Sequence, residues 1–463
     1  MKYNIPIVRK DISVDELIRR IDRSKYSIAF ITDNDDSYIS QTSIYKLRRL
    51  LLSGLDSSDS ISSVLTSTQI KLRENEVSKP KSVKSILIEM ETQGVEFCPI
   101  INSNGKIIDI YSKNDLSNLI SETFKTGSIS KRQGNINNIL VVGGAGYLGS
   151  VLIRELLDKG YYVRVLDKFI YGRNSLNDIK NNKLLEVKEG DIRNIETIIS
   201  SLEDIDAVIL LAAVVGDPAS KARPTQTIET NLLAAQTFAA ACKSQYINRF
   251  IYASTCSVYG KGDDIIDENS PLNPVSLYAR TKIASEQSIM KMANDSFSPT
   301  ILRMGTLYGY SPRMRFDLVV NTMTLKAFSE RIIQVFGGEQ WRPLLHVKDA
   351  AKAYIQCLES PIDRVGNQIF NLGSDEQNYR IFEIANIIKD ALSDDVKIVV
   401  EKSSTDARDY KVSFEKIRNR LDFNVQYNIS EAAKEIYENL KNSIIKNPLA
   451  KVYYNHYFDS TEE

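Results

Sequence analysis

A glycine-rich turn placed directly after a short apolar run constrains this chain more than any other feature. Residues 138–149 read N-I-L-V-V-G-G-A-G-Y-L-G, and an apolar helical pattern continues from Tyr147 to Leu157. Glycine lets a backbone turn tightly and approach a ligand closely, and a helix N-terminus offers free N–H groups to a pyrophosphate. Gly143, Gly146 and Gly149 follow the spacing G-x-x-G-x-x-G, whereas the common dinucleotide fingerprint is G-x-G-x-x-G. The turn therefore predicts a strand, a loop and a helix that together hold a pyrophosphate.

Asp167 stands at the end of the next apolar strand, about two dozen residues after Gly143. A carboxylate at this place can accept hydrogen bonds from both hydroxyls of a ribose, and it would repel a 2′-phosphate. The sequence therefore favours NAD over NADP as the cofactor. An acidic surface turn that binds nothing is the alternative.

Beyond the glycine turn, apolar strands alternate with helical stretches, which predicts βαβ units and a parallel sheet. Strands are expected at 161–166, 184–188, 206–213 and 249–254, and a helix at 227–242. Ligands bind such sheets beyond the carboxyl ends of the strands. The candidate contacts that fall at these ends are expected to share one crevice: Gly143, Asp167, Asp191, Ala212, Ala213 and Thr255.

Length and composition exclude several other classes of protein. With 463 residues the chain is expected to form two or three domains, and 59 basic against 59 acidic side chains leave no net charge to favour nucleic acid or an anionic membrane. Four scattered cysteines without C-x-x-C spacing and two histidines argue against a metal site or a disulfide framework. The N-terminal residues lack the apolar core of a signal peptide, and no apolar run is long enough to span a bilayer. A soluble cytoplasmic protein is expected.

Residues 1–126 contain two similar units. In the second unit, Ser112 and Asp115 open a helix as its N-cap and first-turn acid. The expected elements of the first unit are helices at 14–21 and 44–52, a strand at 27–32 and a turn at 33–36, and those of the second are a helix at 82–94, strands at 95–101 and 106–111 and a turn at 102–105.

This repeated arrangement resembles a pair of cystathionine-β-synthase-type (CBS) repeats, α/β modules that bind adenosine nucleotides. The resemblance implies a ribose contact by a serine or threonine followed three residues later by an aspartate, which Ser112 and Asp115 match. In the first unit Ser43 is followed by Lys46 where the acid should be. A CBS pair with at most one intact adenine-nucleotide site is therefore expected, and a helix cap that binds nothing is the alternative. The polar residues 127–137 are expected to be a linker.

Tyr278 and Lys282 are four residues apart at the start of a predicted helix, so the phenol and the ammonium can lie side by side. A tyrosine with an ordinary pKa near ~10 needs roughly 3 units of depression to act as a base at neutral pH. A neighbouring lysine and the positive nicotinamide ring can supply that depression in a dry cleft. Thr255, at the end of its strand, can present a hydroxyl to the same substrate oxygen.

From residue 138 to 445 the sequence is similar to the extended short-chain dehydrogenase/reductase family, the nucleotide-sugar epimerases and dehydratases. The resemblance implies a Rossmann-type, doubly wound parallel sheet with bound NAD, a small C-terminal substrate subdomain and a tail at 446–463. It implies that Thr255, Tyr278 and Lys282 form the catalytic triad and that Asn231 supports the site. The matching motifs are G-G-A-G-Y-L-G at 143–149, Asp167, G-D-I-R at 190–193, L-A-A at 211–213, Asn231, A-S-T-C-S-V-Y-G at 253–260, Y-A-R-T-K at 278–282, L-R-M-G-T-L-Y-G at 302–309 and R-P-L-L-H-V-K-D-A-A at 342–351.

The family resemblance also assigns cofactor and substrate contacts. Arginine suits bidentate contact with phosphate, and Arg342 and Arg408 are the preferred pair for the pyrophosphate of a nucleotide sugar, with surface ion pairs as the alternative. Thr306 stands where many family members carry an asparagine. The expected substrate contacts are Thr255, Thr306, Asn321, Arg342 and Arg408, with Arg313 and Arg315 as further candidates. The expected NAD contacts are Gly143, Gly146, Tyr147, Leu148, Gly149, Asp167, Asp191, Ile192, Leu211, Ala212, Ala213, Asn231, Tyr278 and Lys282.

The residues after Thr255 separate the possible reactions. The 4,6-dehydratases carry an Asp-Glu pair there, whereas this chain has Cys256 and Ser257, so dehydration is disfavoured. An NAD-dependent nucleotide-sugar epimerase that works by transient hydride transfer through a keto-sugar is the leading hypothesis. A 4-ketoreductase or dehydrogenase with the same triad is the second, and a catalytically silent NAD-binding regulatory protein is the third. A homodimer or larger homo-oligomer is expected.

Overall fold

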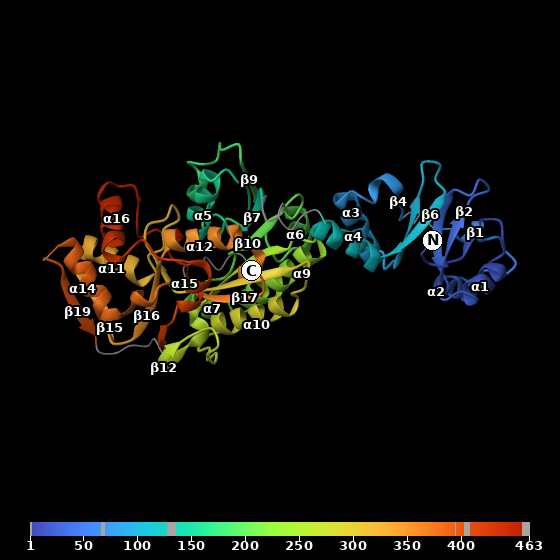
Figure 1. Cartoon of the computed structure of the whole chain (residues 1–463). Helices are drawn as coiled ribbons and strands as arrows, with labels where there is room; N and C mark the ends of the chain where they lie inside the picture. The colour runs from blue at the N-terminus through green and yellow to red at the C-terminus, as the bar shows by residue number, and fades with distance from the viewer. Residues whose placement is uncertain (1, 66–69, 127–135, 394, 402–407, 456–463) are drawn as a thin grey trace. The chain divides into compact units, whose positions relative to one another are not determined.

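The computed structural model describes residues 2–65, 70–126, 136–393, 395–401 and 408–455 (Figure 1). The chain divides into two compact units, Met1–Arg132 and Gln133–Glu463. Residues 127–135 of the predicted linker and 456–463 of the predicted tail lie outside the described residues.

The N-terminal unit contains two copies of one arrangement of strands and helices. In each copy the first strand runs parallel to the second, the second pairs antiparallel with the third, and a helix follows. The first copy has β1 (Ile7–Arg9), α1 (Val14–Asp22), β2 (Ile28–Thr32), β3 (Tyr38–Ser43), α2 (Ile44–Leu52) and the 3-10 turn η1 (Ile61–Val64). The second copy has β4 (Leu72–Arg73), the 3-10 turn η2 (Glu74–Glu76), α3 (Pro80–Thr92), β5 (Phe97–Ile101), β6 (Ile107–Ser112) and α4 (Lys113–Thr126).

The predicted helices and strands of this unit are confirmed, and three strands were missed. β1 and β4 are too short to show a period in the sequence, and the residues of β3 were assigned to no element, since the predicted turn ended at residue 36. The two copies share an apolar core in which Phe30 and Tyr38 pack with Ile101 and Ile110. The N–H of Tyr38 also donates to the carbonyl oxygen of Gly105 at 2.9 Å, so the two hairpins are joined through the backbone.

Among the described residues of the second unit, seven parallel strands form one sheet in the order β17-β13-β11-β10-β7-β8-β9. The chain order reverses beside β7, which creates the switch point where such sheets bind ligands. A Rossmann-type parallel sheet is therefore confirmed. Its strands are β7 (Asn138–Val142), β8 (Tyr162–Asp167), β9 (Leu185–Glu189), β10 (Ala207–Leu210), β11 (Arg249–Thr255), β13 (Ser298–Met304) and β17 (Gln368–Leu372).

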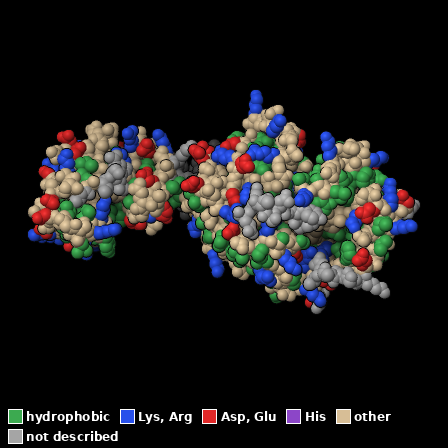
Figure 2. Space-filling model, turned by 180° about the vertical axis from the view of Figure 1, so that it is seen from behind, with side chains coloured by type: hydrophobic (Ala, Val, Ile, Leu, Met, Phe, Trp, Pro, Cys, Tyr) green, Lys and Arg blue, Asp and Glu red, His purple; other side chains and the backbone are tan. Residues whose placement is uncertain are grey.

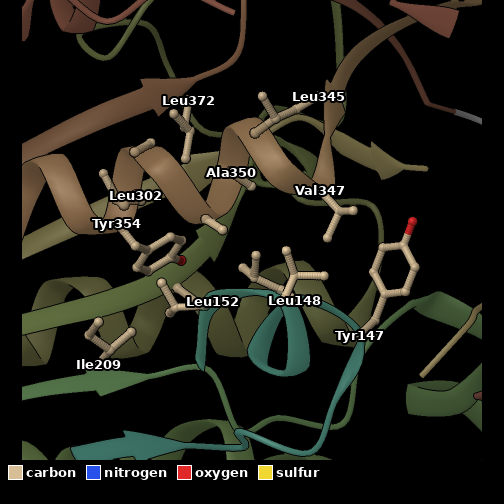
Figure 3. Close-up of a cluster of buried hydrophobic side chains, with 14 of the residues drawn as sticks. Tyr147, Leu148, Leu152, Ile209, Leu302, Leu345, Val347, Ala350, Tyr354 and Leu372 are labelled. Carbon is tan, nitrogen blue, oxygen red and sulfur yellow. The ribbon is translucent and has the colours of Figure 1, made fainter. Parts of the chain in front are cut away.

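Helices cover both faces of the sheet and bury two apolar cores. On one face α5 (Tyr147–Asp158) packs against α12 (Val347–Glu359), and Figure 3 shows Leu148 and Leu152 facing Val347 and Tyr354. Fully burying one such leucine contributes roughly 1.5–3 kcal/mol. On the other face lie α6 (Ile195–Ser201), α9 (Ala235–Ser244) and α10 (Leu277–Lys291).

The predicted helix at 227–242 is interrupted in the structure. It consists of α8 (Pro224–Ile228), a π-helical turn η4 (Glu229–Ala234) and α9, and the short α7 (Asp217–Ala222) precedes it. Periodicity alone cannot distinguish a π turn from an α-helix, since both keep the same face buried. Such turns often occur at functional sites.

The C-terminal part adds a subdomain with its own apolar core, built on α11 (Val319–Glu330), α14 (Ile381–Leu392) and α16 (Ile429–Lys441). Its strands are β12 (Lys261–Ile266) with β20 (Asp409–Val412), β14 (Thr306–Tyr308) with β16 (Trp341–His346) and β18 (Asn378–Arg380), and β15 (Ile332–Phe336) with β19 (Lys397–Glu401). The remaining short elements are α13 (Ile362–Val365), α15 (Glu415–Leu421), η3 (Asn174–Leu176), η5 (Cys256–Tyr259), η6 (Asp375–Gln377) and η7 (Lys451–Tyr453).

Charged side chains of both signs are mixed over the face that Figure 2 shows, in keeping with the equal numbers of basic and acidic residues. None of the described helices combines the length and the apolar character needed to cross a membrane.

Candidate active site

The glycine turn forms a close-packed cradle at the carboxyl end of β7. Gly143 has a φ of +83°, and a Cβ on it would lie 2.7 Å from the backbone nitrogen of Ala212, so no other residue fits. A Cβ on Gly149 would lie 2.5 Å from the carbonyl oxygen of Gly143. Gly146 caps α5 without a side-chain hydrogen bond, which leaves the first N–H groups of the helix open to an anion. The cradle fits a dinucleotide pyrophosphate.

A cavity of about 200 Å³ runs from this cradle along the carboxyl ends of the strands. Nearly all predicted cofactor contacts line it, and Asn231 is the exception. The predicted residues in its wall are Gly143, Gly146, Tyr147, Leu148, Gly149, Asp167, Asp191, Ile192, Leu211, Ala212, Ala213, Tyr278 and Lys282.

Asp167, at the end of β8, is held by two backbone N–H groups. Its Oδ2 accepts from Ala145 at 2.9 Å and its Oδ1 accepts from Phe169 at 2.8 Å. Burial raises the pKa of this carboxyl, although both backbone bonds and the charge of Arg313 oppose the shift. Each oxygen keeps a lone pair that can accept from a ribose hydroxyl. Asp191, the next predicted contact, pairs with Arg193 and Lys168.

Tyr278 lies in the first turn of α10, and its hydroxyl is hydrogen-bonded to Thr255 at the end of β11. Burial raises the pKa of the phenol above its ordinary value, while the charge of Arg315 and the bond to Thr255 oppose this. The depressed pKa expected from the sequence is therefore not produced by the chain alone. The positive nicotinamide ring was part of that expectation.

Lys282 lies one turn after Tyr278 and is only 2% exposed. Its Nζ donates to the carbonyl oxygen of Ala253 at 2.8 Å and lies 6.0 Å from the centroid of the Tyr278 ring. Burial lowers the pKa of the ammonium to about 7, although the carboxylate of Glu286 opposes the shift. The predicted neighbours on one helix face are thus side by side in a dry environment.

Asn231 lies behind the cavity, in the π-helical turn, and clamps the loop that follows β10. Its Oδ1 accepts from the N–H of Val214 at 2.7 Å and its Nδ2 donates to the carbonyl oxygen of Val214 at 2.9 Å. The hydroxyl of Ser285 on α10 donates to the carbonyl oxygen of Asn231 at 2.6 Å. Asn231 therefore joins the cavity wall to the helix that carries Tyr278, as a supporting residue would.

The structure brings the preferred arginine pair together. Nη1 of Arg342 donates to the carbonyl oxygen of Arg408 at 2.6 Å, and the Arg408 guanidinium lies 3.5 Å from the carboxylate of Asp217. Tyr410, two residues later, is hydrogen-bonded to Ser257. The charge of Asp217 also raises the pKa of Tyr278.

None of the predicted substrate contacts, Thr255, Thr306, Asn321, Arg342 and Arg408, lines this cavity. Asn321 on α11 is fully buried: its Nδ2 donates to the hydroxyl of Tyr147 at 3.1 Å and to the carbonyl oxygen of Arg315 at 2.9 Å. Its Oδ1 accepts from the N–H of Gly309 at 3.0 Å. Thr306 begins β14 and pairs with Leu344 of β16. Both substrate roles stay predictions.

The sequence matches the NAD dependent epimerase/dehydratase family over residues 139–373, about half of the chain. The chain belongs to this family. NAD as the cofactor and an NAD-dependent enzyme of the epimerase class, both predicted from the sequence, are confirmed. The match lies within the second compact unit and leaves the N-terminal unit untouched.

The chain has relatives that are named for nucleotide sugars. It is 31% identical over 264 residues to the uncharacterized UDP-glucose epimerase YtcB of Bacillus subtilis (strain 168), which covers 54% of this chain and 81% of the relative. It is 26% identical over 313 residues to a putative UDP-glucose 4-epimerase of Methanocaldococcus jannaschii, 66% of this chain and 99% of the relative. The solved UDP-glucuronic acid 4-epimerase of Bacillus cereus, in complex with UDP-glucuronic acid and NAD, matches with 25% identity and a TM-score of 0.60, over 66% of this chain and 99% of that one.

A buried ionic network that joins α10, β11 and β13 was missed by the sequence analysis. Arg303 on β13 pairs with Glu286 on α10 at 2.7 Å and donates to the hydroxyl of Tyr259 at 2.9 Å. Ser254 on β11 also donates to Glu286. The network joins both neighbouring strands to the helix of this epimerase-family site. No spacing in the sequence signals it, because its members come from segments that meet only in the folded sheet.

The cavity wall also contains residues that the sequence assigned elsewhere or not at all. Arg313 and Arg315, considered for the substrate, line the cofactor cavity, and so do Tyr171 and Asn455.

Cys256, between Thr255 and Ser257, is buried, and its thiol donates a hydrogen bond to the carbonyl oxygen of Arg303 at 3.1 Å. Burial raises the pKa of this thiol, which suits a packing role.

Proposed function

We propose that the chain is an NAD-dependent nucleotide-sugar epimerase that inverts a hydroxyl-bearing carbon through a transient keto-sugar. The observation that carries this proposal is that Tyr278 and Lys282 line the cofactor cavity side by side and that Thr255 is hydrogen-bonded to Tyr278. The residues that follow Thr255 supply no carboxylate for dehydration. The epimerases among the relatives support the same reaction class.

In this proposal the side chains of the protein transfer the proton of the reacting sugar hydroxyl and bind its oxygen. The Tyr278 phenolate takes the proton of the reacting sugar hydroxyl, the phenol so formed later returns it, and Thr255 donates a second hydrogen bond to the same oxygen. The cradle of Gly143, Gly146 and Gly149 would hold NAD, which would supply a reversible hydride acceptor for the sugar carbon. Lys282 holds the phenolate form electrostatically, and the dry surroundings strengthen that attraction.

The substrate class in this proposal is a nucleoside diphosphate sugar. Arg342 and Arg408 stand together, and guanidinium groups suit bidentate contact with a pyrophosphate. The ion pair of Arg408 with Asp217 would open when the substrate enters. The UDP sugars named for the relatives support this class.

Proton NMR with a panel of nucleotide sugars in deuterated buffer tests the function. A C4 epimerase produces a new anomeric signal without solvent deuterium, whereas a C3 or C5 epimerase incorporates deuterium. Denaturing the pure protein and assaying the released cofactor completes the test. Stoichiometric NAD supports the epimerase, and an empty protein that consumes NADH with a 4-keto sugar would identify a ketoreductase instead.

The Tyr278→Phe variant tests the role of the hydroxyl. Turnover is expected to fall by roughly 10²–10⁴-fold while the amount of retained NAD stays the same, since a phenyl ring keeps the packing and loses the proton. Undiminished turnover would remove Tyr278 from the triad.

We also propose that the N-terminal unit is a CBS pair that binds adenine nucleotides at Ser112 and Asp115. Oδ2 of Asp115 accepts from the Ser112 hydroxyl at 2.8 Å and from the Tyr3 hydroxyl, and its Oδ1 pairs with Lys2. A ribose hydroxyl would compete with Tyr3 for this carboxylate. Residues 1–126 would be the nucleotide-binding domain and 138–445 the catalytic one, while a cytoplasmic location and a homo-oligomeric assembly stay predictions.

Calorimetry with AMP and ATP on the full chain tests the CBS proposal. Asp115→Ala should abolish the binding heat, and Tyr3→Phe should strengthen binding because it removes the competing hydroxyl. Absence of a binding heat in the unmodified chain would leave Ser112 and Asp115 with only a helix-capping role.

A further inference from the structure

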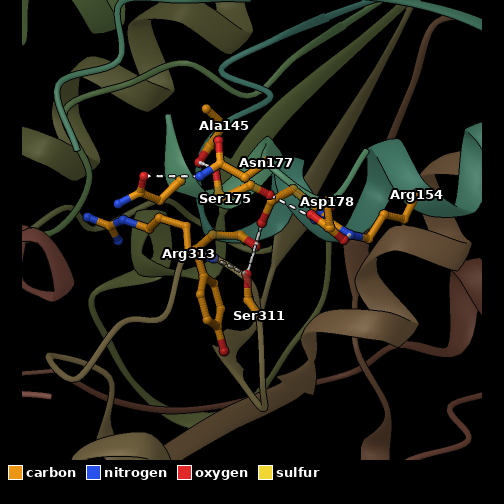
Figure 4. A network of polar contacts seen from close by, with 10 residues as sticks. Ala145, Arg154, Ser175, Asn177, Asp178, Ser311 and Arg313 are labelled. Atoms are coloured by element: carbon orange, nitrogen blue, oxygen red, sulfur yellow. Dashed lines mark hydrogen bonds and ion pairs between the residues drawn. The ribbon is translucent and has the colours of Figure 1, made fainter. Parts of the chain in front are cut away.

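Arg313 lies in a loop that is fastened to the first turn of α5, beside the glycine cradle. The hydroxyl of Tyr147 donates to the carbonyl oxygen of Gly309 at 2.6 Å, and the hydroxyl of Ser311 donates to the carbonyl oxygen of Tyr147 at 2.7 Å. The hydroxyls of Ser311 and Ser150 are 3.0 Å apart. Figure 4 shows Ser311 and Arg313 in one polar network near Ala145. The loop therefore fixes the position of Arg313 relative to the pyrophosphate cradle.

The Arg313 side chain is buried but incompletely satisfied. It is 4% exposed, lines the cofactor cavity and lies over the ring of Tyr171, 3.7 Å from the ring centroid. Nη2 donates to Oδ1 of Asn455 at 2.7 Å. Its Nε is buried and has no hydrogen-bond partner within the part of the chain that the structure describes.

The charge of this guanidinium is not neutralised by a direct ion pair. Among the described residues Arg313 forms no salt bridge, whereas its neighbour Arg315 binds Asp317 through two hydrogen bonds. Burial and the charge of Arg315 lower the pKa of Arg313 to about 10, against the opposing influence of Asp317 and Asp167. A buried cation with an open donor gains most from an anion that enters the same cavity.

We propose that Arg313 binds the pyrophosphate of the NAD cofactor, together with the open N–H groups at the start of α5. The inference rests on the cofactor and not on the identity of the sugar, so it holds whichever nucleotide sugar is the substrate. It moves Arg313 from the substrate, where the sequence analysis placed it, to the cofactor.

Asn455 acts as a positioning residue for Arg313. Besides accepting from Nη2, its carbonyl oxygen accepts from Arg223 at 3.4 Å, and its Nδ2 donates to the carbonyl oxygen of Val215 at 3.5 Å. Asn455 is 5% exposed and comes from the C-terminal end of the described chain. A segment remote in sequence thus aims the guanidinium at the cavity.

Binding measurements with NAD, ADP-ribose and adenosine test the proposal on the full chain freed of its cofactor. Arg313→Gln should weaken NAD and ADP-ribose by roughly 10- to 100-fold, since a charge-assisted bond is lost, and should leave adenosine within about twofold. The matched control is Arg173→Gln, because Arg173 also stacks on a ring, that of Phe169, but is exposed and outside the cavity wall. The control should leave all three affinities unchanged.

Two further variants keep the test informative if Arg313→Gln does not fold. Arg313→Lys should retain part of the affinity for ADP-ribose, and Asn455→Asp should reduce it by placing a neutralising carboxylate on Arg313. Unchanged ADP-ribose binding in these variants, or an equal loss for adenosine, would overturn the proposal. A rise in the KM for a nucleotide sugar with unchanged ADP-ribose binding would assign Arg313 to the substrate. Failure of the epimerase function would leave the ADP-ribose result intact, so the two proposals fail separately.

Discussion

At the scale of single residues, Tyr278 and Lys282 depend on each other. Both are buried, and burial pushes each of them toward its neutral form: it raises the pKa of the phenol and lowers that of the ammonium. A phenolate beside an ammonium is therefore favoured only when the pair ionises together or when another positive charge enters. The i, i+4 spacing predicted that the two groups are neighbours, but their burial was decided by the packing of α10 against β11.

The lowered pKa of Lys282 predicts a pH dependence of stability. In the folded chain the ammonium loses its proton near pH 7, whereas in the unfolded chain it keeps the proton until about pH 10.4. The unfolded state binds more protons between these values, so the destabilisation caused by the buried charge is full below pH 7 and fades as the pH rises.

Denaturant unfolding of the cofactor-free chain and of Lys282→Met measures this effect. The difference in unfolding free energy between the two proteins should change in favour of the lysine form by up to about 1.4 kcal/mol per pH unit between pH 7 and 10. Taking the difference cancels the other titrating groups. A pH-independent difference would show that Lys282 is charged in the folded state.

At the scale of elements, the π-helical turn η4 joins the loop after β10 to α10, the helix that carries Tyr278 and Lys282. Alternating strands and helices were readable from the sequence, because burial on both faces gives parallel strands their continuous apolar runs. The turn was not readable, since it depends on Asn231 meeting the backbone of Val214 seventeen residues earlier. Ser285 then ties the same turn to α10.

Removing these hydrogen bonds should lower the free energy of unfolding, and the loss should grow with the number of buried polar groups that are left without a partner. Asn231→Ala leaves the buried N–H and carbonyl of Val214 without partners and should cost roughly 2–5 kcal/mol, whereas Ser285→Ala should cost about 1 kcal/mol. Thr237→Ala is the matched control, because Thr237 donates to the carbonyl oxygen of Leu233 from an exposed site on the neighbouring helix. Urea unfolding measures these changes. If Asn231→Ala and the control lose the same free energy of unfolding, the turn does not link the loop after β10 to α10.

At the scale of the whole molecule, the chain carries two units with separate apolar cores. The internal repeat of the first unit and the glycine turn of the second were both readable from the sequence. The family match covers only the second unit, so the first one is the part of the protein whose role needs direct measurement.

Calorimetric unfolding should show two transitions, because each unit buries its own core. NAD at a hundred times its dissociation constant adds about 2.7 kcal/mol to the free energy of unfolding of the unit that binds it. This should raise the midpoint temperature of the larger unit by several degrees. The transition of the smaller unit should stay in place, with AMP as the converse ligand if the CBS proposal holds. One transition that moves as a whole with NAD would show that the units unfold together.

The sequence by itself determined the cofactor cradle, the parallel sheet and the pairing of Tyr278 with Lys282, because each of these follows from local spacing. Only the tertiary structure decided which arginines lie beside the glycine cradle. The loop that carries Arg313 is bound to the cofactor cradle by the hydrogen bond from Ser311 to Tyr147. The side-chain amide of Asn321 is hydrogen-bonded to Arg315 of the same loop. The contacts of Ser311 and Asn321 with Tyr147 join segments more than a hundred residues apart, and no local pattern encodes them. Burial and charge at a site are properties of all the segments that meet there, which is why the sheet order had to be known first.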